Sequence, residues 1–290
     1  MSDDIQSSNN SPDSSNRWRS ELKQRYSPNI ATFTIFRYMD GGTYSTSVLS
    51  PYNYNSYYRS ADDHQVAIYK PRTVGLGSED NLVFVGANGL VDINTGGGND
   101  FLIAVRRSAR LDADLGSGND FAVGGWQNDT IKGGSGDDFI DGAFGDDSIL
   151  GGSGNDTLYG SDGNDSLIGN DGDDNLYSGK GNDRLWGGNG ADYFVFNEDD
   201  YQTRSLRQTV TIEDFGRGND LIDLRSFDFK AVGNEITDRR FRIFEDNGFA
   251  HIVINAVPQT GIAELHILVK GMSYDKFVAG TDTYMNYVLV

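Results

Sequence analysis

Apolar residues recur at a fixed interval of nine between Leu115 and Val195, and mostly polar residues and glycines fill the positions between them. Nine consecutive nine-residue units cover this segment, and the eighth position of each unit is apolar. The eighth-position residues are Ala122, Ile131, Ile140, Ile149, Leu158, Leu167, Leu176, Leu185 and Phe194. A constant short period predicts a solenoid, in which each unit adds one inward side chain to a continuous core.

The residue pattern of each unit predicts one short strand and one turn. Stretches such as 157–159 (TLY) and 166–168 (SLI) provide a strand about 10 Å long, with only the middle side chain facing inward. The other six residues form a turn that is rich in glycine, which allows positive φ and a close approach of backbones. The repeats therefore predict an all-β fold.

The pattern changes on both sides of the regular repeats. A tenth unit lies at 95–103, and a weaker echo of the same pattern lies at 75–83. After residue 195, alternating apolar residues predict ordinary strands, including a hairpin around Asn247-Gly248. The predicted domains are a disordered tail at 1–16, a Tyr-rich region of unknown fold at 17–74, the repeat region at 75–195, and a C-terminal β-rich domain at 196–290.

The charge of the chain indicates what has to accompany the repeats. The whole chain carries a formal charge of −19, and residues 115–195 hold fifteen Asp, no Glu and three Lys or Arg, a charge of −12. Such self-repulsion opposes compaction, and it argues against nucleic acid as a partner, because phosphates would be repelled. The chain has no cysteine, which excludes thiolate metal sites and disulfides.

Aspartate occupies the sixth position of every unit. A carboxylate beside inward-facing turn carbonyls forms an oxygen cage, and flexible all-oxygen sites suit Ca²⁺ better than Mg²⁺. One aliphatic side chain in nine cannot offset the conformational entropy of ordering the rest, about 1–2 kcal/mol per residue, so metal binding has to supply folding free energy. The predicted calcium ligands are Asp100, Asp120, Asp129, Asp138, Asp147, Asp156, Asp165, Asp174, Asp183 and Asp192.

These units resemble the RTX (repeats-in-toxin) family, whose motif is G-G-x-G-x-D-x-U-x with a large aliphatic residue at U. The resemblance implies a parallel β-roll with two nonapeptides per turn and Ca²⁺ between neighbouring turns on the same side. Residues 187–290 also resemble the C-terminal regions of serralysin-type proteases and mannuronan epimerase R-modules, through "GADYFVF", "IEDFGRGNDLIDL" and the terminal "YVLV". In those families this region carries an uncleaved type I secretion signal, which fits the lack of an apolar stretch in the N-terminal "MSDDIQSSNNSPDSSN".

If the units alternate between two edges of the roll, their loops fall into two sets. The first edge takes the loops that begin at Leu115, Gly133, Gly151, Gly169 and Gly187. The second edge takes those that begin at Gly124, Gly142, Gly160 and Ser178, and it departs more from the motif, with Gln127 in place of a glycine. We predict tighter calcium binding at the first edge, with at most four sites there and three at the second.

The same alternation aligns aromatic residues on one sheet face. They are Phe121, Phe139, Tyr159, Tyr177 and Tyr193. Two interpretations stay open. Residues 17–94 or the C-terminal region cover this face, or it is a binding face for polysaccharide or another surface.

No catalytic motif is recognisable. The chain has no H-E-x-x-H, G-x-S-x-G or Walker A sequence, and no apolar run long enough to span a membrane. We therefore predict a secreted, extracellular, non-enzymatic calcium-binding protein whose partners are calcium, a type I secretion machinery, and a cell surface, matrix or polysaccharide. The alternative is a small hydrolase, lyase or toxin with its active site in residues 17–94, where 62–64 (DDH) is the acid–base cluster.

Overall fold

A computed structural model describes residues 57–59, 65–68, 73–104, 109–201, 207–229, 231–232, 235–236, 240–255, 264–275 and 287–289. The chain divides into two compact units, Met1–Tyr54 and Asn55–Val290, and every described residue lies in the second. The predicted tail at 1–16, most of the Tyr-rich region at 17–74, and the cluster at 62–64 fall outside the described residues.

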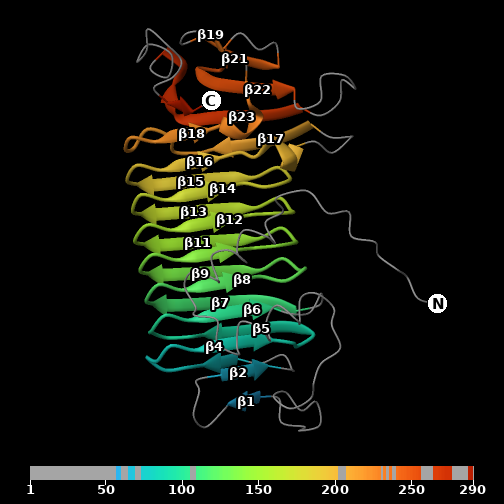
Figure 1. Cartoon of the computed structure of the whole chain (residues 1–290), viewed down its shortest axis with the longest axis vertical. Helices are drawn as coiled ribbons and strands as arrows, with labels where there is room; N and C mark the ends of the chain where they lie inside the picture. The colour runs from blue at the N-terminus through green and yellow to red at the C-terminus, as the bar shows by residue number, and fades with distance from the viewer. Residues whose placement is uncertain are drawn as a thin grey trace, which may run out of the picture. The chain divides into compact units, whose positions relative to one another are not determined.

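Two long sheets make up most of the unit Asn55–Val290 (Figure 1). The first, sheet A, contains in spatial order β1 (Tyr57–Arg59), β2 (Gln65–Ile68), β4 (Leu82–Val85), β6 (Phe101–Ala104), β8 (Phe121–Val123), β10 (Phe139–Asp141), β12 (Thr157–Tyr159), β14 (Asn175–Tyr177), β16 (Tyr193–Val195), β18 (Leu221–Asp223) and β24 (Val288–Leu289). The second, sheet B, contains β21 (Phe241–Asp246), β22 (Phe249–Asn255), β23 (Glu264–Ser273), β17 (Arg207–Ile212), β15 (Arg184–Asn189), β13 (Ser166–Asp171), β11 (Ser148–Ser153), β9 (Thr130–Ser135), β7 (Ala109–Ser117), β5 (Gly89–Asn94) and β3 (Thr73–Gly75).

Successive strands alternate between the two sheets, so one strand from each sheet and two loops form a coil of the solenoid (Figure 1). Between β8 and β16 each residue pairs, in parallel, with the residue 18 positions further on, as Ile140 does with Leu158. Upstream the coils are longer, because Val83 pairs with Leu102 and Val91 pairs with Leu111. The parallel roll with two nonapeptides per turn is therefore confirmed, and it extends into the degenerate units at 75–83 and 95–103.

The core is a column of side chains from both sheets. All nine eighth-position residues are at most 1 % exposed and belong to one buried cluster. Because a parallel register repeats in every coil, each of these side chains stacks on the equivalent side chain of the next coil. The all-β class is confirmed: in the described part of the chain, helix is limited to the 3-10 helices η1 (Glu198–Tyr201) and η2 (Arg225–Phe227) and to residues 274–275.

The prediction of three-residue strands is right for sheet A and wrong for sheet B. In the regular repeats β8 to β16 span three residues in sheet A, whereas β9, β11, β13 and β15 span six in sheet B. The sheet B strands are longer because the next loop stays in register, for example where Gly152 pairs with Asn170 and Ser153 with Asp171. The first edge of the roll consists of these extended loops.

Both sheets continue beyond the predicted repeat region. At the C-terminal side β17 pairs with β15 and β23, and β18 pairs with β16 and β24. The predicted hairpin is present as antiparallel β21 and β22, with positive φ at Asn247 and Gly248. A separate two-stranded pair is formed by β19 (Ala231–Val232) and β20 (Glu235–Ile236). The domain boundaries at 74/75 and 195/196 stay predictions, and neither coincides with the end of a sheet.

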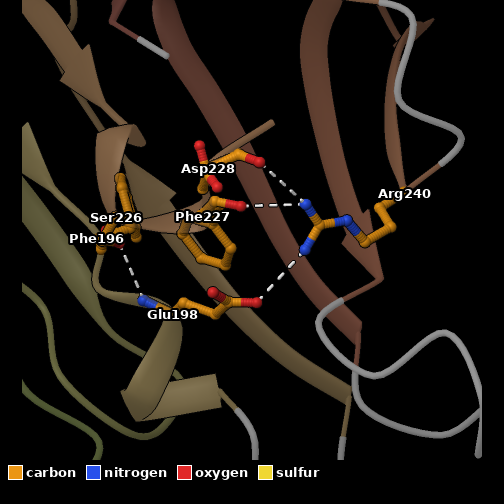
Figure 2. Close-up of polar contacts among 6 residues, drawn as sticks. All are labelled: Phe196, Glu198, Ser226, Phe227, Asp228 and Arg240. Atoms are coloured by element: carbon orange, nitrogen blue, oxygen red, sulfur yellow. Dashed lines mark hydrogen bonds and ion pairs between the residues drawn. The ribbon is translucent and has the colours of Figure 1, made fainter. Parts of the chain in front are cut away.

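A cluster of hydrogen bonds connects the segments that follow the last regular repeat (Figure 2). The Arg240 guanidinium donates to Glu198 Oε1 (3.3 Å) and to the carbonyl oxygens of Phe227 (3.0 Å) and Asp228 (3.4 Å). Ser226 Oγ accepts from the Glu198 amide and donates to the Phe196 carbonyl, 2.9 Å in each case. These bonds join η1, η2 and the residue before β21.

Outward-facing aromatics of sheet A fall into two groups. Phe101, Phe121 and Phe139 stack at 4.8 Å between ring centroids and are all buried. Tyr159 stacks on Tyr177 at 4.2 Å, and both rings, like Tyr193, are part-exposed. The predicted aromatic ladder is therefore present, and its phenylalanine part is not an open surface.

Candidate metal centre

The loops of the first edge stack closely enough to require glycine. Gly134 and Gly136 have φ of 118° and 120°. A Cβ atom at these positions would lie 2.0 Å from the Gly116 carbonyl oxygen and 1.9 Å from that of Gly118, respectively. Any other residue would combine backbone strain with a collision against the preceding coil. The glycines of the motif thus allow loop backbones to stack directly on one another.

The sixth-position aspartates form a row along each edge of the roll. In each pair of coils, one Asp carboxylate accepts a hydrogen bond from the backbone N–H of the Asp one coil earlier, as Asp138 Oδ1 does from Asp120 (2.8 Å) and Asp156 Oδ1 does from Asp138 (2.9 Å). The first-edge row contains Asn81, Asp100, Asp120, Asp138, Asp156, Asp174, Asp192 and Asp220. The second-edge row contains Asp129, Asp147, Asp165 and Asp183, with Leu111 N–H at its start.

The second carboxylate oxygen has no partner in nine of the ten predicted ligands. The Oδ2 atoms of Asp100, Asp120, Asp138, Asp147, Asp156, Asp165, Asp174, Asp183 and Asp192 are buried and make no hydrogen bond. Leaving one buried polar atom unsatisfied costs about 1–3 kcal/mol, and more when the group is charged. Nine such atoms in two rows are suited to bind cations.

The pKa values of these aspartates also indicate that the rows favour a bound cation. Burial, followed by the charges of neighbouring aspartates, raises the pKa of Asp147 to about 9 and that of Asp183 to about 8, although each accepts a backbone hydrogen bond that lowers it. Burial likewise raises the pKa of Asp138 to about 8 and that of Asp156 to about 6. Ionisation of the buried aspartates in both rows is therefore unfavourable unless positive charge lies nearby.

In the six of these nine units that begin with glycine, the absence of a side chain leaves room beside the unpartnered oxygen. A Cβ atom on Gly151 would lie 2.2 Å from Asp156 Oδ2, and one on Gly169 would lie 2.1 Å from Asp174 Oδ2. A side chain at the first position would thus occupy the space next to the unpaired carboxylate oxygen.

Comparison with known proteins bears directly on these loops. The family model of the RTX calcium-binding nonapeptide repeat matches in four copies, at residues 114–149, 141–175, 150–185 and 168–201. The four matches together cover residues 114–201. Similarity to this repeat family implies calcium binding by these residues.

Solved structures provide a second comparison. Among 28 solved chains that match is the solution structure of the AlgE6R3 subunit of the mannuronan C5-epimerase from Azotobacter vinelandii. It is 24% identical, with a TM-score of 0.31, and the match covers 51% of this chain and 82% of that one. No curated protein matches the chain. Among the described residues, no helix has the length and apolar character needed to cross a membrane.

The RTX repeats of this chain fit calcium in their donor atoms. Each coil places one sixth-position aspartate at each edge, and the described residues contain no group of three or more His, Cys, Asp or Glu side chains suited to a metal. An ion between two coils therefore needs backbone carbonyls besides carboxylates. Ca²⁺ accepts that mixture of oxygen ligands, whereas Zn²⁺ prefers nitrogen and sulfur.

One of the ten predicted residues differs from the others. Asp129 Oδ2 accepts a hydrogen bond of 2.7 Å from the Gly125 N–H, so its carboxylate is satisfied without a cation. Its loop contains Gln127 in place of the usual glycine. A second irregularity is Ser178, which replaces the first-position glycine of its unit and pairs through Oγ with Tyr201 Oη (2.7 Å). Both of these loops lie on the second edge, and on the first edge Leu115 also replaces a first-position glycine.

Sequence reasoning missed the end of the first-edge row. Asp220 Oδ1 accepts from the Asp192 N–H (3.2 Å), and its Oδ2 accepts from the Gly216 N–H (2.6 Å). Asp214 accepts from the N–H groups of Gly187 and Gly188. The signal was present, because 215–223 (FGRGNDLID) has Asp in its sixth position and an apolar residue in its eighth. An insertion after β16 hid it by breaking the period.

Proposed function

We propose that this chain is a secreted protein whose RTX roll folds when its aspartate rows receive calcium, and that it acts non-enzymatically at a cell surface, matrix or polysaccharide. The observation that carries the proposal is the pair of aspartate rows with buried, unpartnered Oδ2 atoms. Bound Ca²⁺ would supply the positive charge that these carboxylates lack.

The proposed ligands are the ten sixth-position aspartates, Asp100, Asp120, Asp129, Asp138, Asp147, Asp156, Asp165, Asp174, Asp183 and Asp192, together with loop carbonyls of neighbouring coils. We propose that the first edge holds calcium more tightly than the second. Support comes from its loops, which remain in strand register from coil to coil and whose regular-repeat aspartates all have an unpartnered oxygen. On the second edge, Asp129 is already satisfied by Gly125.

Export follows from the same charges. At cytosolic calcium levels the acidic repeats, with −12 over 115–195, resist compaction, which suits passage through a type I secretion channel. Extracellular calcium modules bind with a Kd of about 10⁻⁴–10⁻³ M, so the roll would fold only after export. Folding outside the cell would also hold the chain there.

For the surface partner we propose a polysaccharide or other extracellular polymer. The part-exposed Tyr159, Tyr177 and Tyr193 on sheet A supply the support, since tyrosine offers a flat apolar face and a polar hydroxyl. A glycan array probed with and without calcium tests this part. Retention of any glycan only in calcium supports it, and no retention in either condition contradicts it.

Far-UV circular dichroism during a calcium titration tests the folding proposal, with magnesium as the matched control. We expect a cooperative gain of β-signal with a midpoint of about 10⁻⁴–10⁻³ M Ca²⁺, and no comparable gain with Mg²⁺. A chain that already has its full β-signal in chelator would overturn the proposal, because the aspartate rows would then fold without a cation.

A further inference from the structure

Two of the three histidines of the chain meet on the outer face of sheet B, away from the aspartate rows. Val253 on β22 pairs with His266 on β23, and His251 on β22 pairs with Leu268 on β23. His251 and His266 are therefore diagonal neighbours on the face opposite the core residues Ile252 and Ile267. His251 Nδ1 lies 2.7 Å from His266 Nε2, and the ring centroids are 4.9 Å apart.

Neighbouring side chains hold this pair in place. The Phe244 ring, on β21, stacks on His251 at 5.1 Å with an interplanar angle of 12° and lies 6.1 Å from His266. His251 is buried and His266 is half-buried, so solvent reaches the pair from the His266 side. Both rings therefore pack against Phe244.

The close approach of the two rings excludes a doubly protonated pair. At 2.7 Å the two facing nitrogens share at most one proton, because two imidazolium N–H groups would repel. Neutral imidazole is the form that binds metal ions.

We propose that His251 and His266 form a two-imidazole site for a divalent transition metal of the Cu²⁺ or Ni²⁺ class, separate from the calcium rows. Imidazole nitrogen suits these ions, whereas Ca²⁺ takes oxygen ligands.

The separation of the nitrogens is compatible with one shared ion. With metal–nitrogen bonds of about 2.0–2.1 Å, two ligands at a right angle require nitrogens about 2.9 Å apart. The two nitrogens are hydrogen-bonded at 2.7 Å, so an ion that replaces the proton between them would move them slightly apart. Among divalent first-row ions, Cu²⁺ binds a given nitrogen site most tightly.

Water would complete the coordination. Glu264, the nearest carboxylate along β23, is held by Arg207 (3.3 Å) and Arg242 (3.2 Å). The described residues offer no group of three or more His, Cys, Asp or Glu side chains for a metal. The site therefore has two protein ligands, and we expect it to bind less tightly than a three-histidine site.

The test uses the full chain without a polyhistidine tag, saturated with calcium so that the aspartate rows do not compete. Titration with Cu²⁺ is followed by calorimetry and by pulsed electron paramagnetic resonance, which detects coordinated imidazole nitrogen. We expect one equivalent of Cu²⁺ with two imidazole nitrogens, and weaker binding of Zn²⁺. His251→Gln and His266→Gln should each weaken Cu²⁺ binding at least tenfold.

His64→Gln is the matched control, since it removes the third histidine of the chain and should leave Cu²⁺ binding unchanged. The calcium midpoint of folding, measured on every variant, separates a lost site from a misfolded chain. Copper that shows no imidazole coordination in the unaltered protein, or equal affinity in folded His266→Gln, would overturn the proposal. Neither result bears on calcium-dependent folding, so the two proposals fail independently.

Discussion

The divided role of each sixth-position carboxylate is the main feature at the scale of single residues. Asp156 uses Oδ1 to accept the Asp138 N–H at 2.9 Å, and its Oδ2 stays buried and unpartnered. One oxygen therefore aligns neighbouring coils, and the other is left for a cation. Burial of such a carboxylate destabilises the folded roll when no cation is bound. Once a cation binds, the same carboxylate stabilises the fold.

Asp156→Asn separates the two roles, because asparagine keeps an oxygen for the Asp138 N–H and removes the charge. We expect the calcium midpoint of folding to rise about tenfold, which corresponds to about 1.4 kcal/mol. Circular dichroism during calcium titration measures the midpoint. Asp112→Asn is the control, because Asp112 is exposed on β7 and the substitution removes the same charge away from the loops. If both variants raised the calcium midpoint equally, the net charge of the chain, rather than the buried Oδ2 atom of Asp156, would determine calcium-dependent folding.

At the scale of elements, stacking of loops sets the spacing of the coils. A Cβ on Gly154 would lie 2.2 Å from the Gly136 carbonyl oxygen, and Gly154 has φ of 121°. The loops are therefore as closely packed as the strands, and the six-residue strands of sheet B continue into them. Packing in this solenoid includes backbone against backbone, besides side chains in the core.

Gly154→Ala should accordingly separate two neighbouring coils. We expect a loss of at least about 2 kcal/mol in the free energy of unfolding in saturating calcium, from strained φ together with the collision. Urea unfolding followed by circular dichroism measures it. Gly77→Ala provides the comparison, since its Cβ would have nothing within 4 Å, and we expect a change near zero there. Similar losses in both variants would show that loop flexibility, rather than close stacking, explains the effect.

At the scale of the whole roll, the aspartate rows couple folding to pH. Burial raises the pKa of Asp120, Asp165 and Asp192 to about 7 each, against about 3.9 for an unfolded aspartate. The calcium-free folded roll therefore binds more protons than the unfolded chain. Its stability is greatest at low pH and is lost as the pH rises through the folded-state values of about 6 to 9.

The prediction is that in chelator the β-signal is larger at pH 5 than at pH 8.5, whereas in saturating calcium it persists at pH 8.5. Protons and calcium compete for the same carboxylates, so the calcium midpoint should rise as the pH falls through the folded-state pKa values of about 9 to 6. Circular dichroism at fixed ionic strength, with gel filtration to exclude aggregation, measures both. A chelated chain that gains β-signal with rising pH would contradict the assignment of these carboxylates as buried and unpaired.

Much of the fold and of the candidate site was predictable from the sequence. The nine-residue period, with aspartate sixth and an apolar residue eighth, determines an all-β solenoid with one core side chain per unit and an oxygen-rich loop. These features are local, because each depends on residues within one unit. The same locality explains why Asp100 and the degenerate unit at 95–103 can be recognised from the amino-acid pattern alone.

Only the tertiary structure decided features that depend on neighbouring coils or on distant segments. The exception at Asp129 depends on the Gly125 N–H, and the longer strands of sheet B depend on pairing 18 residues away. Asp220 joins its row across an insertion, and His251 meets His266 because β22 and β23 pair in one register. A periodic sequence determines what each coil contains, whereas contacts between coils and beyond the repeats arise only when the chain is stacked.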